Sequence, residues 1–182
     1  LMALLGVWNI SLLGLPTLAI LPYDSRLARF PAFLQQLDME SNGKRVSRDG
    51  RPVSRETAPV VWGEPGNNAQ HSFFQLLHQG SPRAAMDFLI SARSSCGDEE
   101  QHELALANAL AQAEAFLRGQ RGPDVPSHKV HEGGRPVSLL MFERVEPRTL
   151  GALVAAYEHK VYAQSVLWDI NAFDQWGVEL GK

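Results

Sequence analysis

The stretch WGEPGNNAQHSFFQLLHQG, residues 62–80, decides the fold, because an apolar strand ends there and an amphipathic helix begins a few residues later. The intervening GEPGNN is rich in turn-forming residues, and Asn67 or Asn68 is expected to cap a helix that ends at Gly80. In open parallel α/β sheets, ligands bind beyond the carboxyl ends of the strands. This junction is therefore where we expect the chemistry.

The helix predicted within this stretch has a polar face and an apolar face. His71 is expected in its first turn, and Gln75 and His78 follow on the same face at spacings of four and three residues. The opposite stripe, expected to face the core, is made of apolar residues: Phe73, Leu76 and Leu77.

Strand and helix patterns alternate along the rest of the chain. Buried strands are predicted at residues 17–23, 58–62, 84–91 and 137–145. Helices of ten or more residues are predicted at 24–40, 98–119 and 147–168, with a further short helix near the end. This alternation indicates an α/β protein with three layers, α/β/α, in which a mainly parallel sheet is covered on both faces.

Local signals refine the first half of this pattern. Asp24 or Ser25 is expected to cap the helix at 24–40, and Pro31 is expected to kink it. The Asp49-Gly50 pair, set in a polar segment, predicts a small exposed hairpin.

The helix at 98–119 has acidic residues in its first turn and ends at Gly119. It is predicted to bury one side, made of Leu106, Leu110 and Leu117. The segment at 120–136, rich in Pro, Gly and His, is expected to be a surface loop.

Composition limits the classes of function. The 182 residues are 45% hydrophobic, which suits one sizeable domain. The net charge is −3 with both signs dispersed, and no face gathers Lys or Arg, so we exclude nucleic acid as a main partner.

Two features of the sequence bear on location. The single cysteine, Cys96, has no second thiol for a disulfide or metal pair, which favours a reducing compartment and hence the cytoplasm. The first twenty residues are uncharged, but Asn9 and Ser11 interrupt the apolar run and Gly14 with Pro16 splits it. We therefore expect neither a signal peptide nor a membrane segment.

Short motifs narrow the candidate residues. The GVELGK ending has one residue too few between its glycines for a phosphate loop. His128 and His131 could share a metal, but solvated loop histidines are the preferred interpretation, and we predict no metal site. The polar residues that remain as candidates for a functional site are Gln36, Glu40, His71, Gln75, Gln175 and Lys182.

Several long blocks of sequence resemble, in order, the glucose-6-phosphate isomerase (phosphoglucose isomerase) family. They are LPYDSRLARF, QQLDMESNGK, WGEPGNNAQHSFFQLLHQG, LGALVAAYEHKVYAQ and WDINAFDQWGVELGK. The resemblance extends from about Ala3 to Lys182 and is highly specific, because it rests on blocks rather than on one short pattern.

The resemblance implies a role for each candidate residue. The Glu of MESNGK, Glu40, is implied to be the isomerisation base, and His71 and Lys182 are implied to act in ring opening. Gln36 and Gln175 match positions that line the sugar-phosphate site. The family uses no metal or organic cofactor.

The resemblance also implies an assembly. Members of the family have two sugar-isomerase-type (SIS) α/β/α domains, and residues 1–182 look like the second of them, truncated at both ends. They are cytoplasmic homodimers of glycolysis and gluconeogenesis that interconvert glucose 6-phosphate and fructose 6-phosphate, without nucleic acid or membrane partners. The ring-opening His comes from the neighbouring subunit, and the phosphate ligands come from the first domain.

The chemistry of the residues fits these roles. Interconverting an aldose and a ketose moves a proton between adjacent carbons through an enediol, and one carboxylate can both take and return it; such catalysis contributes ~10²–10⁴-fold. From the residues alone, the preferred interpretation of Glu40 is a cap of the turn at 41–43 or a solvated acid, and His71 could bond a nearby carbonyl; the resemblance favours the base. A domain that binds sugar phosphate or serves in assembly, with no turnover of its own, stays open as the alternative function.

Overall fold

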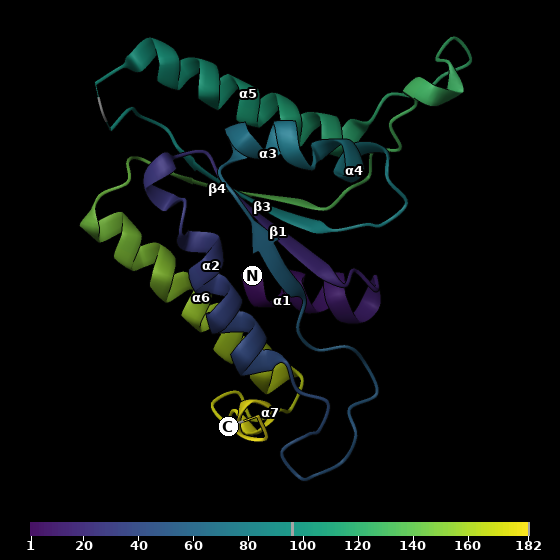
Figure 1. The fold of residues 1–182 in the computed structure, drawn as a ribbon, viewed down its shortest axis with the longest axis vertical. Helices are drawn as coiled ribbons and strands as arrows, with labels where there is room; N and C mark the ends of the chain where they lie inside the picture. The colour runs from purple at the N-terminus through teal and green to yellow at the C-terminus, as the bar shows by residue number, and fades with distance from the viewer. Residues whose placement is uncertain (96, 182) are drawn as a thin grey trace.

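A parallel sheet lies between two layers of helices (Figure 1). The computed structural model describes residues 1–95 and 97–181, so the prediction that rests on Cys96 lies outside the described residues. The strands are β1 (Thr17–Pro22), β2 (Val60–Gly63), β3 (Ala85–Ser91) and β4 (Val137–Phe142). Their order is β2-β1-β3-β4, and every pair is parallel. The predicted three-layer α/β/α fold is confirmed.

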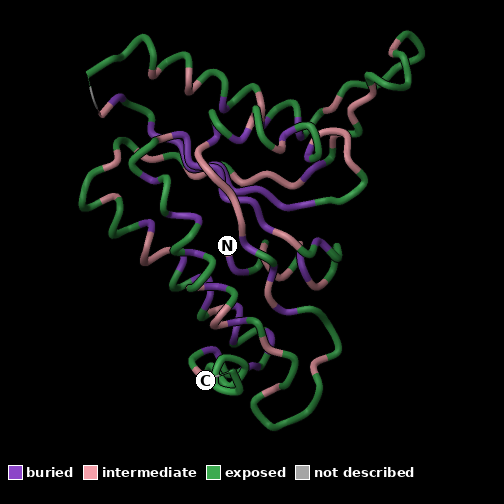
Figure 2. The backbone as a smooth tube through the Cα atoms, in the orientation of Figure 1, coloured by how far each residue is buried: buried purple, intermediate pink, exposed green. Residues whose placement is uncertain are grey.

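Helices cover the sheet on both faces (Figure 1). One face carries α3 (Gly66–Ser72), α4 (Phe74–Gln79) and α5 (Glu99–Arg118). The other carries α1 (Met2–Val7), α2 (Phe30–Leu34) and α6 (Pro147–Leu167). Figure 2 shows that the buried residues concentrate in the sheet and on the helix sides that face it.

Burial explains why the strands read as apolar runs. All seven residues of β3 are buried, because this strand has neighbours on both edges and helices on both faces. Alternate residues enter different cores: Phe88 packs with α4 and α5, whereas Leu89 packs with α2 and α6.

The helix predicted at 24–40 is divided into three segments. Asp24 caps a 3-10 turn, η2 (Ser25–Leu27), by accepting a hydrogen bond from the backbone N–H of Arg26. The helix α2 follows, and then a π-helix, η3 (Gln35–Glu40). Pro31 lies in the first turn of α2, where its missing N–H costs nothing, so the prediction that it kinks a continuous helix is wrong.

The helix predicted after residue 66 begins earlier and breaks once. Pro65 precedes the first helical residue, so neither Asn67 nor Asn68 is the cap. The chain leaves helical geometry at Phe73, between α3 and α4, which breaks the helical spacing used to assign the faces. Consequently Phe74 and Leu77 are buried, whereas Leu76, predicted to face the core, is 47% exposed.

The two ends of α5 are as predicted, but its buried side is not. Asp98 accepts a hydrogen bond from the backbone N–H of Gln101 at the start, and Gly119 ends the helix with φ of 66°. The buried side consists of Ala109, Ala113 and Phe116. Of the leucines predicted there, Leu106 is half-buried, and Leu110 and Leu117 are exposed. Small alanines let this helix approach the sheet closely, which the leucine spacing did not reveal.

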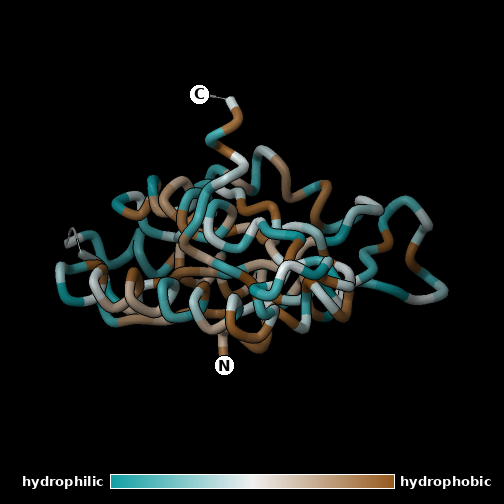
Figure 3. The backbone as a smooth tube through the Cα atoms, turned by 90° about the horizontal axis from the view of Figure 1, so that it is seen from below, coloured by the Kyte–Doolittle hydropathy of each residue, from teal (hydrophilic) through white to brown (hydrophobic). Residues whose placement is uncertain are grey.

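The remaining segments lie outside the sheet and its helices. The predicted hairpin at 46–52 is confirmed by the antiparallel bridge between Val46 and Pro52. The loop at 120–136 contains a 3-10 turn, η4 (Ser127–Lys129). A π-helix, η1 (Trp8–Leu12), follows α1, and a short helix, α7 (Trp176–Glu179), lies in the C-terminal segment that projects from the body (Figure 3). Among helices of the described residues, none is long and apolar enough to cross a membrane.

Candidate active site

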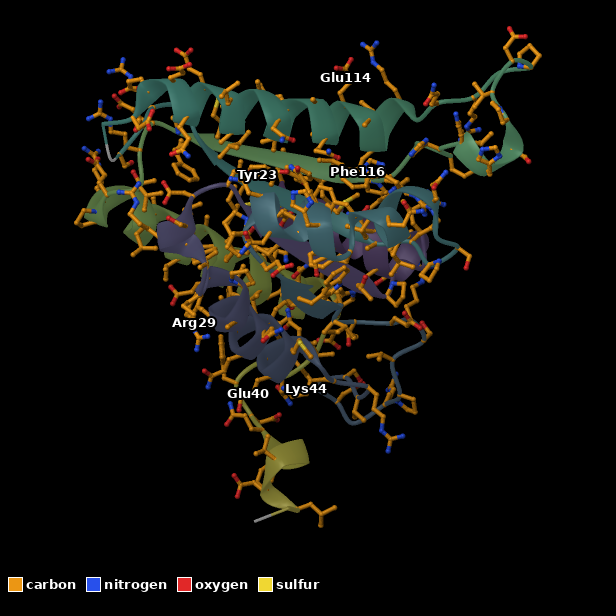
Figure 4. All side chains as sticks on the ribbon, turned by 45° about the horizontal axis from the view of Figure 1, so that its top comes forward. Tyr23, Arg29, Glu40, Lys44, Glu114 and Phe116 are labelled. Carbon is orange, nitrogen blue, oxygen red and sulfur yellow. The ribbon has the colours of Figure 1, made fainter. Side chains whose placement is uncertain are left out.

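The segment MESNGK, residues 39–44, forms a tight turn at the end of η3. Glu40 is the last residue of this π-helix and is half-buried. Figure 4 places Glu40 and Lys44 at the same end of the molecule, beside the start of the projecting C-terminal segment. Short π-helical segments are rare and occur frequently at functional sites, so this geometry directs attention to Glu40.

Backbone contacts fix the shape of the turn. The N–H of Gly43 donates to the carbonyl of Met39 at 3.0 Å. A Cβ at position 43 would collide with that same carbonyl oxygen, which explains the glycine. The Lys44 ammonium then donates to the carbonyls of Glu40 and Ser41, at 2.9 and 2.7 Å. A cation at a helix C-terminus satisfies carbonyls that have no helical partner.

Two further segments attach to this turn. The buried hydroxyl of Thr57 lies 2.9 Å from the carbonyl oxygen of Asn42 and 2.7 Å from that of Lys44. Lys44 Nζ is also 3.6 Å from a carboxylate oxygen of Asp174. The residue after Asp174 is Gln175, so this ion pair brings the C-terminal segment to the side of Glu40.

A buried polar network lies behind the turn. Asp38 of η3 and Lys160 of α6 form an ion pair at 3.0 Å. Lys160 Nζ also lies 5.4 Å from the ring centre of Tyr157, whose hydroxyl donates to Asp87 on β3 at 2.9 Å. Burial raises the pKa of Asp87, although the nearby Lys160 charge opposes the shift. Burial and the Asp87 charge raise the pKa of Tyr157 well above its usual value.

Four of the five predicted site residues lie in the described part of the chain. Gln36 precedes Glu40 by four residues, close to one helical turn, and is exposed. Gln175 is exposed and immediately precedes α7. The structure therefore brings Gln36, Glu40 and Gln175 to one end of the molecule. Lys182 lies outside the described residues.

His71 lies elsewhere, and its local prediction needs correction. It is exposed and occupies the last turn of α3, not the first turn of a helix as predicted. The helix α3 packs in the core shared with α4 and α5, whereas η3 continues α2 and packs in the core on the other face. Glu40 and His71 thus belong to helices that cover opposite faces of the sheet.

The junction at residues 62–80 does not gather the predicted site residues. A cleft of about 560 Å³ opens at the carboxyl end of β1, lined on one side by Tyr23 and Asn67 and on the other by His102. Glu40 instead follows Met39, whose sulfur lies 3.4 Å from the backbone nitrogen of Val61, near the amino end of β2. The expectation that the chemistry collects at that junction is therefore wrong for Glu40.

Sequence reasoning missed the residues that hold Glu40 in place. Lys44, Thr57 and Asp174 had no assigned role, although Lys44 belongs to the quoted MESNGK block. Only the adjacency of Lys44 to a predicted helix end could have suggested its contacts with the terminal carbonyls.

Metal ligation receives no support from the described residues. Within 1–95 and 97–181, no group of three or more His, Cys, Asp or Glu residues could hold an ion. His131 instead packs edge-on against His78, with ring centres 5.5 Å apart.

The fold and the site define a class of protein: a three-layer α/β/α domain that presents a carboxylate at the end of a π-helix. The phosphoglucose isomerase family model matches residues 1–182, and the chain belongs to that family. The resemblance stated from the sequence blocks is confirmed.

Similar proteins agree with this assignment. The chain is 53% identical to a glucose-6-phosphate isomerase of Methylocella silvestris and 52% identical to one of Deinococcus deserti, with all of this chain covered in both. It superposes on a crystal structure of a glucose-6-phosphate isomerase from Chlamydia trachomatis with a TM-score of 0.92 and 42% identity, covering 99% of this chain. In all three comparisons, the match spans only 36% of the other protein's length.

Proposed function

We propose that residues 1–182 supply the isomerisation base of an enzyme that interconverts glucose 6-phosphate and fructose 6-phosphate in glycolysis and gluconeogenesis. The observation that carries the proposal is the fixed position of Glu40 at the end of η3, held by the MESNGK turn. The similar proteins named glucose-6-phosphate isomerase support the same reaction.

The proposed chemistry centres on Glu40. Once the sugar ring is open, its carboxylate takes the proton from the carbon beside the carbonyl, which leaves a cis-enediolate. The carboxylic acid then returns this proton to the neighbouring carbon while the hydroxyl proton passes from one sugar oxygen to the other, so an aldose becomes a ketose with no net change in protons or electrons. The return on the same face requires a base that does not move, which the turn provides.

The other predicted residues complete the proposed site. His71 and Lys182 assist ring opening by moving a proton between the ring oxygen and the anomeric hydroxyl. Gln36 and Gln175 donate hydrogen bonds to the sugar hydroxyls or accept hydrogen bonds from them. Both residues are exposed, so their amides are accessible to substrate. No step in this scheme uses a metal or organic cofactor.

The assembly is part of the proposal. We infer that these residues form the second of two SIS-type domains and that the whole protein is a cytoplasmic homodimer acting on sugar phosphates, without nucleic acid or membrane partners. The segments η3 and α3 lie on opposite faces of the sheet. This arrangement supports the homodimer, because the His71 of one copy can then act in the same site as the Glu40 of a second copy.

An activity assay on the whole protein that contains this chain tests the function. A coupled assay with fructose 6-phosphate should show isomerase turnover, and Glu40→Gln should remove it. The alternative, a binding or assembly domain without turnover, predicts sugar-phosphate binding by calorimetry with no product in the wild-type protein.

A further inference from the structure

Two adjacent residues of α6 hold the chain on both sides of Glu40. The Lys160 ammonium lies 3.0 Å from the carboxylate of Asp38, two residues before Glu40. The carbonyl of Val161 accepts a hydrogen bond from the side-chain amide of Asn42 at 3.1 Å, two residues after Glu40. We infer that Lys160 and Asn42 are positioning residues for Glu40, an inference that rests on the proposed function.

Burial makes both contacts stiff. The side chains of Lys160 and Asp38 are 4% and 3% exposed, and Asn42 is fully buried. A charge withdrawn from water is strongly destabilised when its partner moves away, so neither side chain can exchange its contact for solvent. The ion pair and the amide bond therefore resist any rotation of η3 relative to α6.

The π-helix gives these contacts a specific task. A π-helix has more residues per turn than an α-helix and persists only where other contacts favour it. If η3 relaxed to α-helical geometry, the residues that follow would rotate by about 100° for each residue of register change. Asp38 lies inside the π-segment and Asn42 lies just beyond it, so their bonds to α6 fix the register in which Glu40 is presented.

Contacts with β2 fix the other side of the same segment. The side-chain amide of Gln35 donates to the carbonyl of Val61 at 3.1 Å, and the N–H of Val61 lies 3.4 Å from the sulfur of Met39. These bonds hold η3 against the sheet. The segment that ends at Glu40 is thus held by α6 on one side and by β2 on the other.

The first test compares hydrogen bonds on the two faces of the sheet, in the whole protein that contains this chain. Asn42→Ala removes the bond to Val161 and should lower kcat by about 10–100-fold, with KM within about twofold of wild type, because small displacements of a catalytic group have effects of this size. Gln79→Ala is the control. It removes bonds from α4 to the carbonyls of His128 and Val130, on the face of the sheet opposite η3. Its melting temperature should fall, with kcat unchanged.

The second test removes the ion pair without leaving the Asp38 carboxylate unpaired. Lys160→Met alone strands the Asp38 carboxylate and can prevent folding, whereas Lys160→Met combined with Asp38→Asn leaves a neutral, similarly sized pair. The double variant should fold, by circular dichroism, and show the same loss in kcat with little change in KM. The conservative Lys160→Arg should retain most of the turnover.

The outcomes separate the two proposals. Wild-type kcat in folded Asn42→Ala and in the folded double variant overturns the inference and leaves the proposed function standing. Absence of isomerase turnover in the unsubstituted protein overturns the proposed function, and the inference with it, before any variant is made.

Discussion

Glu40 and His71 belong to helices that cover opposite faces of one sheet. Glu40 ends η3, which continues α2 and packs with α6, whereas His71 lies in the last turn of α3, on the side of α4 and α5. A sheet packed on both faces is too thick for side chains to meet across it, since each packed layer adds about 10 Å. Within one copy of the chain, this acid and this imidazole therefore belong to different helical layers.

Mixed dimers test whether a second copy supplies the imidazole. Glu40→Gln and His71→Ala versions of the whole protein should each be inactive alone. After subunit exchange, a heterodimer should regain about one functional site, because one of its two sites receives both wild-type residues. A coupled assay after mixing measures the recovery. If mixing restores no activity although mass spectrometry detects the heterodimer, the two residues act within one chain.

Gly43→Ala tests the turn that presents Glu40. The added methyl group meets the carbonyl oxygen of Met39, which is backbone and cannot swing aside. We expect the turn to open and kcat to fall by roughly tenfold or more, since displacement of the base by an ångström has effects of this order.

A glycine in the open part of α6 provides the control for this substitution. Gly151 is exposed, and an added Cβ would have nothing within 4 Å. Gly151→Ala should leave kcat unchanged and stabilise the protein by ~0.5–1 kcal/mol, because alanine loses less backbone entropy in a helix. Equal kcat values for the two variants would contradict the role given to the turn.

The environment of His78 makes stability depend on pH. The ring of His78 stacks on Phe116, with centres 3.9 Å apart, and its Nε2 lies 2.9 Å from Gln112 Oε1. Burial lowers the pKa of His78; the Gln112 hydrogen bond opposes this shift, and the nearby His131 and Arg135 charges reinforce it. The folded protein therefore favours neutral His78.

The sign of the stability effect follows from this lowered pKa. An unfolded His binds a proton below a pH of about 6.5, whereas folded His78 binds one only at lower pH, so the free energy of unfolding should decrease as the pH falls from about 7 through the folded pKa. His78→Phe keeps a ring against Phe116 and should weaken this pH dependence. Denaturant midpoints at several pH values measure it. Identical pH dependence in wild type and variant would exclude His78 as its source.

The layers of the fold were predictable from the sequence, but the side of each helix that faces the core was not. Strands such as AMDFLIS can be recognised from their mostly apolar residues, because a central parallel strand is buried on both faces. The helix faces depend on continuous helical spacing, which breaks at Phe73 and again in the π-helix η3. Neither break has a sequence signal as clear as a proline or glycine. That is why Leu76 was assigned to the core although it is exposed.

The sequence blocks point to candidate residues for the site, but not to the contacts that support them. Glu40, Gln36 and Gln175 were identified through sequence blocks, and the structure brings them to one end of the molecule. The contact between Asp38 and Lys160 joins residues 122 positions apart. No local pattern encodes such a pairing, because burial of both charges depends on how α6 packs against η3.

Hydrogen exchange during turnover tests the central claim, that Glu40 is the base, most directly. The whole protein containing this chain is incubated with fructose 6-phosphate in deuterated water, and the deuterium in the sugar is followed by NMR. Glu40→Gln keeps the size of the side chain but cannot accept a proton, so exchange and isomerisation should fall together by at least ~10²-fold, while calorimetric binding of the substrate persists. Deuterium incorporation at the wild-type rate in folded Glu40→Gln would contradict the account.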